Sequence, residues 1–378
     1  MMNNGILRGW KECKLGEICY QITDGKHGDC INEENSGYFF LSAKDVKDGK
    51  LLYENARQIA KTDFEETHKR TNLKPGDILI TNSGTIGRMA IAPLDDKTYR
   101  TTFQKSVAII KPIPTIIEKY FCYYRLLADF SRLVDLAGGT TQQNLLLGDL
   151  REHLIFFPPI SEQRAIAGVL SSLDNKIDLL HRQNKTLEGM AEAFWWKMFV
   201  EEADPGWKKG KLGDLIELCY GKGLKEENRI PGRYPVLGSS GIVGYHNDFL
   251  VKGPGIVIGR KGTLGVVNYV EEDFFPIDTT YFIKSKTNAG KLFFEYFLLK
   301  EFSFEEMNSD SAVPGLNREI AESMEFIVPE IDSIYKFNDS CEPLFSKKMW
   351  NGNQIRNLSR IRDTLLPKVM SGEVVVKT

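Results

Sequence analysis

The sequence of 378 residues contains no run of about 18 apolar residues, the length that a membrane-spanning helix needs. No apolar signal-peptide core follows Met1, so we expect no secretory leader. The six cysteines form no C-x-x-C pair, and the five histidines share no metal-ligand spacing. These absences argue against a membrane protein, a zinc ribbon and a redox dithiol, and they favour free thiols in the cytoplasm.

The chain also lacks an excess of either charge. It has 49 basic and 51 acidic residues, a net charge of −2. A strongly basic nucleic-acid-binding protein is thereby disfavoured, so any nucleic-acid contact must come from a local patch or be shared with a partner. Apolar residues make up 42% of the chain, which is enough to bury cores in two or three domains of about 150 residues.

Motifs for catalysis are missing as well. No G-x-x-x-x-G-K-[ST] phosphate loop is present. An amino-methyltransferase needs Asn, Asp or Ser before a Pro-Pro-aromatic motif, but Phe157 precedes Pro158-Pro159, which we interpret as a turn before a helix. Asp77 with residues 95–97 imitates a metal-dependent nuclease cluster only loosely. We therefore predict no catalytic residue, no metal site and no cofactor on this chain.

An internal duplication is the most informative feature that is present. Residues 10–18 recur as 207–215, 84–87 as 262–265, 119–127 as 291–299, and 156–158 as 327–329. The four matches keep the same order, so we interpret them as one unit used twice, with loops of different length.

Each copy begins with a Gly-rich segment that is also rich in β-branched and aromatic residues, about 10–155 and 207–327. Apolar runs predict strands at 77–81, 106–110, 255–258 and 280–283, and helical patterns cover 116–130 and 290–304. We expect a compact α+β domain in each copy.

Each copy then continues into a long helical pattern. Ser161 and Asp332 are the expected N-caps, and Pro367 is expected to end the second helix near Leu366. Apolar residues recur at alternating spacings of four and three, the coiled-coil period. An alternative is a pair of ordinary amphipathic core helices. The predicted seams are Ile166, Leu170, Leu173, Ile177, Leu180, Asn184, Leu187, Ala191, Phe194 and Met198, and Phe337, Cys341, Leu344, Lys348, Asn351, Ile355, Leu358, Arg362, Leu365 and Val369.

The short linker at 200–206 spans at most about 25 Å, so the second domain must lie near the end of the first helix. To bury its seam, the second helix must run back along the first. We therefore predict two duplicated α/β domains at opposite ends of an antiparallel coiled coil, with pseudo-two-fold symmetry and Asn184 facing Asn351. The predicted boundaries are 1–155, 156–199 (helix), 200–206 (linker), 207–328, 329–370 (helix) and 371–378 (tail).

A rigid spacer with similar domains suits either a split DNA site or two protein epitopes. The residues favour the first, because the chain resembles the specificity subunit of type I restriction-modification enzymes across nearly its whole length. The motifs that carry the resemblance are residues 10–18, 76–80, 141–145, 157–164, 255–262, 314–318 and 365–373. One departure is visible: residues 329–334 differ from the Pro-Pro-Ile-Ser-Glu-Gln of the first copy, so the contact made by Glu162 and Gln163 is not expected to recur.

The resemblance implies two target recognition domains, each reading one half of a split double-stranded DNA sequence. It implies helices that dock methyltransferase subunits and, through the complex, restriction and translocation subunits. Adenine methylation and ATP-driven cleavage then belong to those partners, which hold S-adenosylmethionine, ATP and Mg. We expect a non-catalytic, bacterial or archaeal defence protein that binds DNA weakly alone and tightly with its methyltransferase subunits.

Polar loops supply the candidate DNA contacts, and each has a purely structural alternative: a tight turn, a helix N-cap or a strand connection. Arg260 is also a candidate for a guanine edge, and Gln or Asn for adenine. Trp195 and Trp196 are expected in the core or at a partner. The candidates are Asn82, Ser83, Gly84, Thr85, Arg88, Thr141, Gln142, Gln143, Asn144, Ser239, Ser240, Tyr245, His246, Arg260, Lys261, Gly262, Thr263, Asn317 and Arg318.

Three alternatives remain open: a protein-binding scaffold with a coiled-coil spacer, a specificity subunit without partners, and an enzyme that acts alone. The missing cofactor and metal motifs disfavour the enzyme. DNA binding with and without methyltransferase subunits separates the other two from the leading hypothesis.

Overall fold

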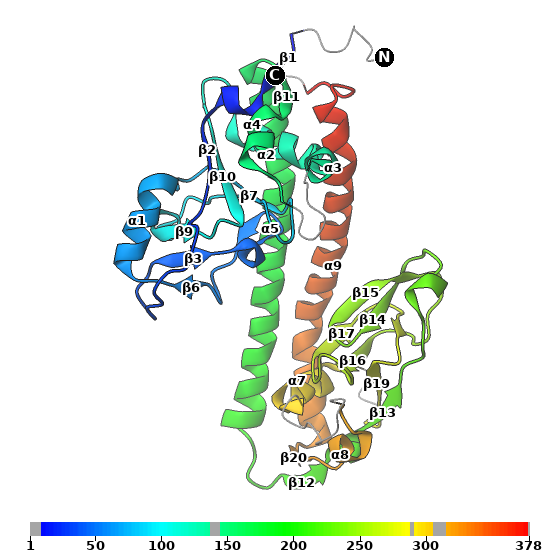
Figure 1. The fold of residues 1–378 in the computed structure, drawn as a ribbon. Helices are drawn as coiled ribbons and strands as arrows, with labels where there is room; N and C mark the ends of the chain where they lie inside the picture. Colours follow the sequence, from blue (N-terminus) through cyan, green and yellow to red (C-terminus); the bar gives the residue numbers. More distant parts are fainter. Residues whose placement is uncertain (1–8, 137–143, 288–290, 305–314, 377–378) are drawn as a thin grey trace. The chain divides into compact units, whose positions relative to one another are not determined.

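The computed structural model describes residues 9–136, 144–287, 291–304 and 315–376, which fold as two units (Figure 1). Unit 1 comprises residues 1–178 and 356–378, and unit 2 comprises residues 179–355. Helices α5 (Ile160–Trp196) and α9 (Ile331–Met370) each contribute to both units. Each unit therefore contains one domain of the duplication and a part of each long helix.

A four-stranded antiparallel sheet with the order β2-β10-β7-β8 forms the centre of unit 1. Its inner strands are buried along their length, because they read as continuous runs of Ile, Leu, Val and Ala. A β1–β11 pair, a β4–β5 pair and a β6-β3-β9 sheet complete the strands. The elements are β1 (Lys11–Lys14), β2 (Cys19–Asp24), β3 (Phe39–Leu41), β4 (Val46–Lys47), β5 (Lys50–Leu51), β6 (Arg57–Gln58), α1 (Lys61–Thr71), β7 (Ile78–Thr81), β8 (Met89–Ile91), β9 (Thr101–Phe103), β10 (Val107–Pro112), α2 (Lys119–Ala128), α3 (Phe130–Asp135), α4 (Leu147–Glu152) and β11 (Leu154–Phe157).

Unit 2 repeats this plan. Its antiparallel sheet has the order β13-β19-β16-β17, a β12–β20 pair matches β1–β11, and a β15-β14-β18 sheet matches β6-β3-β9. The three sheets that match confirm the duplication that the sequence predicts, and the β4–β5 pair is an addition of unit 1. The elements are β12 (Lys208–Lys211), α6 (Leu212–Leu215), β13 (Ile216–Tyr220), β14 (Tyr234–Gly238), β15 (Gly241–His246), β16 (Gly255–Gly259), β17 (Val267–Val270), β18 (Phe275–Pro276), β19 (Thr280–Ser285), α7 (Phe293–Glu301), α8 (Arg318–Glu322) and β20 (Glu325–Val328).

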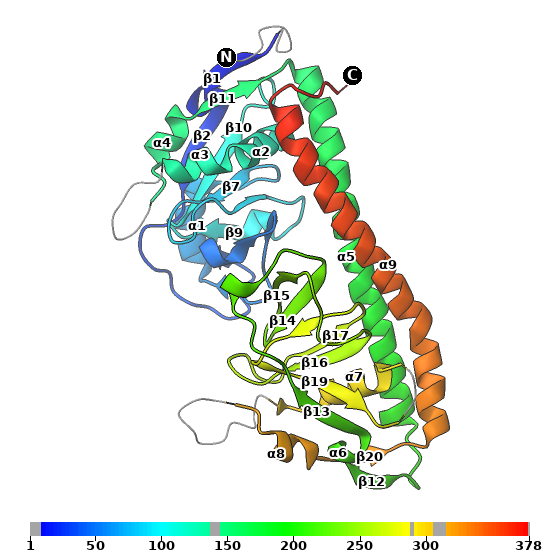
Figure 2. The ribbon, with the colours of Figure 1, turned by 90° about the vertical axis from the view of Figure 1, so that its right-hand side faces the viewer.

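The core of unit 1 lies where α2 packs between the sheet and the long helices (Figure 2). Phe121 and Tyr124 of α2 join Leu170 of α5 and Met370 of α9 in one buried apolar cluster. The end of α9 is also tied to α2 by a hydrogen bond of 2.8 Å from Arg125 Nη1 to the carbonyl oxygen of Met370. The last turn of α9 is therefore an integral part of unit 1.

Aromatic side chains dominate the corresponding core of unit 2. Trp195 of α5 is buried, and its ring lies 5.1 Å from Phe294 of α7 and 5.7 Å from Phe337 of α9. The predicted seam residue Phe194 is instead 39% exposed. The apolar spacing after Ala191 is thus four residues rather than three, because the bulk of α7 draws Trp195 inward.

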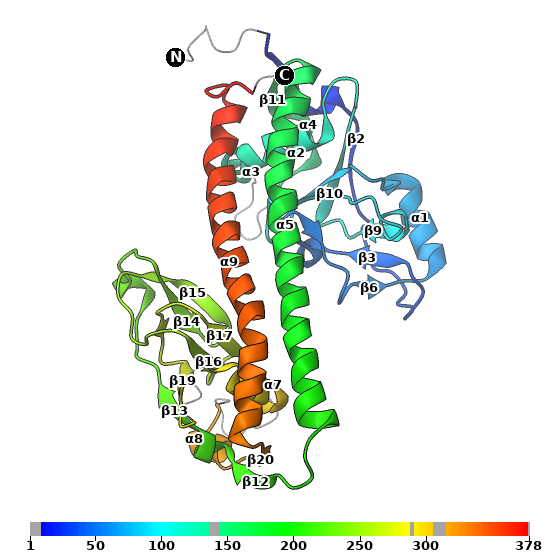
Figure 3. The same ribbon diagram turned by 180° about the vertical axis from the view of Figure 1, so that it is seen from behind.

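Within each unit α5 and α9 pack as antiparallel helices (Figure 3). In unit 1, Arg362 Nη1 donates to Asp174 Oδ1 at 2.8 Å. In unit 2, Lys348 Nζ donates to Glu188 Oε2 at 2.7 Å. Lys348 and Arg362 are two of the polar residues in the predicted apolar seam, and these pairs explain why a cation is tolerated there. No helix in the described residues has the length and apolar character to cross a membrane.

The predicted contact between the two seam asparagines is present. Asn351 Nδ2 donates to Asn184 Oδ1 at 2.9 Å in unit 2. Asn351 is fully buried, and among the described residues its own Oδ1 has no hydrogen-bond partner. A buried amide pair of this kind disfavours any register that would leave the amides unmatched.

The predicted helix ends need correction. Helix α5 begins at Ile160, because Pro159 O accepts from Gln163 N at 3.1 Å, so Ser161 lies inside the helix. Likewise Glu330 O accepts from Ser333 N at 3.0 Å, so Asp332 lies inside α9. Helix α9 passes Pro367 and ends at Met370, since a missing N–H near the last turn costs one hydrogen bond while Met370 gains a buried position.

Gln163 hydrogen-bonds the segment before α2, and the sequence predicts no repeat of this contact in the second copy. In unit 2 a different residue makes the corresponding hydrogen bonds. Buried Gln163 accepts from Glu118 N at 2.8 Å and donates to Ile116 O at 3.1 Å, which holds the segment before α2. In unit 2, buried Asn338 accepts from Phe294 N at 3.0 Å and donates to Lys291 O at 2.8 Å. A shorter amide, placed one turn further along its helix, thus holds α7.

Candidate nucleic-acid interface

The Gly-Thr-Ile-Gly loop of unit 1 is a tight turn at the end of β7. Gly87 N donates to Thr81 O at 2.8 Å, and Arg88 N donates to Thr81 Oγ1 at 2.9 Å. Gly84 and Gly87 have φ of 77° and 84°, which side-chain-bearing residues rarely adopt. The turn interpretation is therefore correct, and it leaves Gly84 and Thr85 exposed at its tip.

The loop of unit 2 has the same backbone frame at the end of β16. Gly265 N donates to Gly259 O at 3.0 Å, and Gly262 and Gly265 have φ of 79° and 74°. Asn82 and Ser83 of unit 1 occupy the positions of Arg260 and Lys261 in unit 2. The duplicated frame thus carries different side chains at matching places. Asn82 is 8% exposed and therefore buried, whereas Arg260 is half-buried and Lys261 is exposed.

A second candidate segment pairs with each loop. In unit 1, Ser83 forms an antiparallel bridge with Asn144, and Leu145 N donates to Asn82 O at 2.9 Å. In unit 2, Lys261 forms the same bridge with Gly315. The structure therefore brings the two predicted polar segments of each copy together. Thr141, Gln142 and Gln143 lie outside the described residues.

Asn317 and Arg318 follow this pairing in unit 2. The side chain of Asn317 accepts from Glu319 N at 2.8 Å and from Ile320 N at 3.2 Å, so it is the N-cap of α8. Arg318 remains half-buried beside the ring of Tyr220, 5.9 Å from its centre. The capping alternative thus holds for Asn317, whereas Arg318 stays available at the surface.

The stretch from Ser239 to Tyr245, for which the sequence predicts a loop, belongs to a β-hairpin. Strands β14 and β15 pair antiparallel, and Ser239 and Ser240 form the turn between them. A Cβ added to Gly259 would lie 2.8 Å from Ser239 O, so this turn packs directly against the start of the Gly-Thr-Leu-Gly loop of unit 2. Tyr245 is exposed on β15.

His246 does not belong to this surface. It is 9% exposed, and its Nδ1 accepts a hydrogen bond of 3.0 Å from Ile230 N. Its ring packs edge-on against Phe275 at 5.8 Å. We therefore assign His246 to the support of the hairpin and remove it from the candidate contacts.

Sequence reasoning missed Tyr220, which ends β13 and lies under Arg260. The guanidinium carbon of Arg260 is 4.8 Å from the centre of the Tyr220 ring and 5.5 Å from that of Tyr281. Burial raises the pKa of Tyr281 to about 12, so this phenol stays neutral under the arginine. The sequence does offer a signal for Tyr220. This aromatic residue directly precedes Gly221-Lys222, and that pair is the counterpart of Gly25-Lys26 in unit 1.

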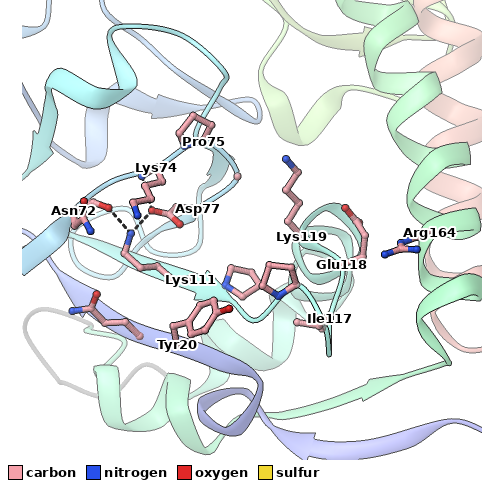
Figure 4. A pocket seen from close by; sticks show the side chains of 14 residues that line it. Tyr20, Asn72, Lys74, Pro75, Asp77, Lys111, Ile117, Glu118, Lys119 and Arg164 are labelled. Carbon is pink, nitrogen blue, oxygen red and sulfur yellow. Dashed lines mark hydrogen bonds and ion pairs between the residues drawn. The ribbon is translucent and has the colours of Figure 1, made fainter.

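A cleft of about 880 Å³ lies in unit 1, lined by Tyr20, Asp77, Lys111, Lys119 and Arg164 among others (Figure 4). Asp77 forms an ion pair with Lys111 and accepts from Lys74 N at 2.8 Å. Burial raises the pKa of Asp77, although Lys111 opposes this. Asp77 precedes β7 whereas Asn82 follows it, so this cleft and the Gly-Thr-Ile-Gly loop of unit 1 lie at opposite ends of one strand.

The loose nuclease-like cluster of the sequence does not form around Asp77. Asp95 Oδ1 accepts from Lys97 N at 2.8 Å within its own turn, and neither residue lines the cleft. Across the described ranges, no three His, Cys, Asp or Glu side chains form a group that could hold a metal ion.

Taken together, the fold and the loops define a tandem recognition protein: one α+β domain used twice, each with a paired surface loop at the same place. The family described as type I restriction modification DNA specificity domain matches residues 8–189 and 205–337. The chain belongs to this family. As a specificity subunit it is a recognition component and not a catalytic one.

Two relatives and one solved structure show how far the similarity extends. The chain is 28% identical to the type I restriction enzyme MjaIX specificity subunit of Methanocaldococcus jannaschii, with 89% of this chain and 87% of that protein covered. It is 27% identical to a putative type I specificity subunit of Mycoplasma genitalium, with 85% and 87% covered. The crystal structure of the type I restriction-modification S subunit from M. genitalium shares the fold, with a TM-score of 0.61 over 97% of each chain at 22% identity.

Proposed function

We propose that this chain reads a split double-stranded DNA sequence, one half with each unit, and presents it to methyltransferase subunits of a type I restriction-modification complex. The observation that supports this is the duplicated loop pair. The backbone frame is the same in both units, yet Asn82-Ser83 in one is replaced by Arg260-Lys261 in the other. Two equal frames with different side chains suit two half-sites of different sequence.

Methyltransferase subunits would dock on the long helices. Exposed apolar side chains gather there without a core role, as large exposed apolar groups do at protein interfaces. In unit 2 they include Met190, Trp196, Met349 and Trp350. The complex would act on DNA in the cytoplasm, with S-adenosylmethionine, ATP and Mg held by the partner subunits.

The net charge of −2 sets an expectation for binding strength. Phosphate neutralisation supplies much of the affinity of DNA-binding proteins, and this chain carries little excess positive charge to provide it. We expect weak DNA binding by the isolated chain and tight binding once methyltransferase subunits enclose the duplex.

Gel shifts with and without the methyltransferase subunits test this proposal. The expected result is a sequence-specific shift that appears at physiological salt only with the partners. Tight specific binding by the chain alone would contradict the shared-binding account. The absence of any sequence preference in either case would favour a protein-binding scaffold instead.

A further inference from the structure

Arg260 is held unusually firmly for a surface arginine. Its backbone N donates to Thr279 O at 2.9 Å, and its O accepts from Leu316 N at 3.0 Å. Its Nη1 donates to Asp278 O at 3.1 Å. The position of the guanidinium is therefore set from both the backbone and the side chain.

Two tyrosine rings lie beneath Arg260, and their centres are 5.1 Å apart. Tyr281 is core, since it is fully buried and its hydroxyl donates to Leu316 O at 3.0 Å. Tyr220 is 52% exposed, yet it lies between two cations, with Arg260 4.8 Å and Arg318 5.9 Å from its ring centre. An exposed ring between two arginines provides a stacking surface for them.

We propose that Tyr220 is a positioning residue that fixes Arg260 to read a guanine in the half-site of unit 2; this rests on the DNA-reading function proposed above. Stacking covers the face of the guanidinium and leaves its edge uncovered by the rings. One Nη1 N–H on that edge donates to Asp278 O, and the remaining donors lie on Nη1, Nη2 and Nε. Among the described residues no carboxylate forms an ion pair with Arg260, whereas the neighbouring Arg318 lies 4.0 Å from Glu322. The donors of this planar fork that Asp278 O does not occupy match the O6 and N7 acceptors of guanine in the major groove.

Unit 1 lacks this device. Asp24 ends β2 where Tyr220 ends β13, and Asn82 stands where Arg260 stands. Asp24 Oδ2 lies 2.8 Å from His27 Nε2, and Asp24 also pairs with Arg70 at 3.4 Å. The guanine contact is therefore expected from unit 2 alone.

The test measures methyl transfer by the complex of this chain with its methyltransferase subunits. The substrate is duplex DNA that carries the motif methylated by the wild-type complex. Each guanine of both half-sites is replaced in turn by 7-deazaguanine, which lacks the N7 acceptor. We expect one position, in the half read by unit 2, to lower kcat/KM at least about tenfold.

Variants then separate positioning from mere structure. Arg260→Lys is expected to lose that sensitivity, because an ammonium cannot make the paired contact. Tyr220→Leu is expected to raise KM about three- to tenfold on the natural motif with kcat unchanged, and to reduce discrimination at that guanine alone. Tyr220→Phe keeps the ring and should restore both. Tyr20→Leu, at an exposed tyrosine of unit 1, is the matched control.

Two results would overturn the proposal. One is the absence of any guanine sensitive to the 7-deaza replacement from both half-sites. The other is a folded Tyr220→Leu complex that loses activity equally on all base substitutions, or that Tyr220→Phe does not rescue. A wild-type complex that methylates no split motif would instead refute the proposed function, and with it this inference.

Discussion

Units 1 and 2 build the same four-stranded sheet, β2-β10-β7-β8 and β13-β19-β16-β17, but they surround it differently. In unit 2 the turn of the β14–β15 hairpin packs against the Gly-Thr-Leu-Gly loop. In unit 1 the matching strand β3 pairs with the short strand β6, and a β4–β5 pair follows it. The difference teaches that the duplicated frame holds the loop, while the surrounding segments decide what lies beside it.

The interiors of the two units differ in the same way. Unit 1 buries Arg125, Asp129 and His153 as a charged cluster behind α2. Unit 2 buries Glu295 on α7, where the hydroxyls of Ser285 and Thr287 donate to it. The two copies of the fold therefore bury different polar groups behind the sheet. Unit 1 buries a carboxylate with cationic partners, and unit 2 buries a carboxyl group that accepts hydrogen bonds from hydroxyls.

The largest expected effect comes from breaking the charged cluster of unit 1. Asp129 is 4% exposed, and Arg125 Nε donates to it at 2.9 Å. Asp129→Ala leaves Arg125 buried without its partner and should cost unit 1 about 3–5 kcal/mol. Hydrogen exchange in urea would show lost protection in unit 1 and unchanged protection in the sheet of unit 2. Asp135→Ala, an exposed neighbour on α3, is the control, and equal effects of both variants would contradict this account.

The amide contacts that hold α2 and α7 allow a matched test of the duplication. Gln163→Met removes three hydrogen bonds, and Asn338→Leu removes two. Each should destabilise its own unit by about 2–3 kcal/mol, because buried backbone groups are left unpaired, with the larger effect at Gln163. Hydrogen exchange of α2 and α7 would report each loss separately. An effect of Asn338→Leu confined to unit 1 would show that the two amides are not equivalents.

Stability should depend on pH in opposite senses in the two units. Burial raises the pKa of Glu295 above its ordinary value of 4.5, so unit 2 loses stability as pH rises from 4.5 towards the folded-state pKa. The pKa of Asp129 lies below its ordinary value of 3.8, because hydrogen bonds from His153 and Arg125 outweigh burial. Unit 1 therefore keeps this contribution above 3.8 and loses it as pH falls through the folded-state pKa.

Tryptophan fluorescence reports mainly on unit 2, because Trp195, Trp196, Trp207 and Trp350 lie there, whereas unit 1 contains Trp10. A Trp10→Phe background removes the signal of unit 1. Urea unfolding followed by tryptophan fluorescence should give a midpoint for unit 2 that falls as pH rises above 4.5. Glu295→Gln should flatten this dependence. A variant with the wild-type slope would show that another group controls it.

The smallest expected effect concerns the helix pair of unit 2. Asn184→Leu with Asn351→Leu replaces a buried amide pair, one oxygen of which has no partner in the described residues, by apolar contact. The double variant should be about 1 kcal/mol more stable in urea unfolding, and less selective in helix register. A loss of stability greater than about 1 kcal/mol would show that the pair contributes more than register.

Much of the architecture was predictable because periodicity and duplication are properties of the chain itself. The central strands β7, β10, β16 and β19, the long helices and the Asn184–Asn351 contact follow from spacing. The exposed Phe194 and buried Trp195 did not follow, because the residue that enters a core depends on the partner surface, here α7. Helix ends also escaped, since Pro367 lies near a buried last turn whose tertiary contacts outweigh the local preference.

The candidate site was predictable in outline only. Gly84 and Gly262 marked the loops, because their left-handed backbone requires glycine. The burial of His246 was not visible, since its partner Ile230 N is distant in sequence. Tyr220 escaped for the same reason, because stacking under Arg260 requires two strands to come together.

The central claim is that one backbone frame, used twice, reads two halves of one split motif with different side chains. Gly84-Thr85 and Gly262-Thr263 match, so Arg260→Asn with Lys261→Ser gives the loop of unit 2 the Asn-Ser-Gly-Thr sequence of unit 1. The measurement is single-molecule methylation sequencing of the native host, with the gene deleted and then restored as wild type or as this double variant. We predict a split adenine-methylated motif that disappears on deletion, and a double variant that changes or relaxes one half while the other half and the gap stay the same. A motif unchanged in both halves, or both halves altered by a folded variant, would contradict the claim.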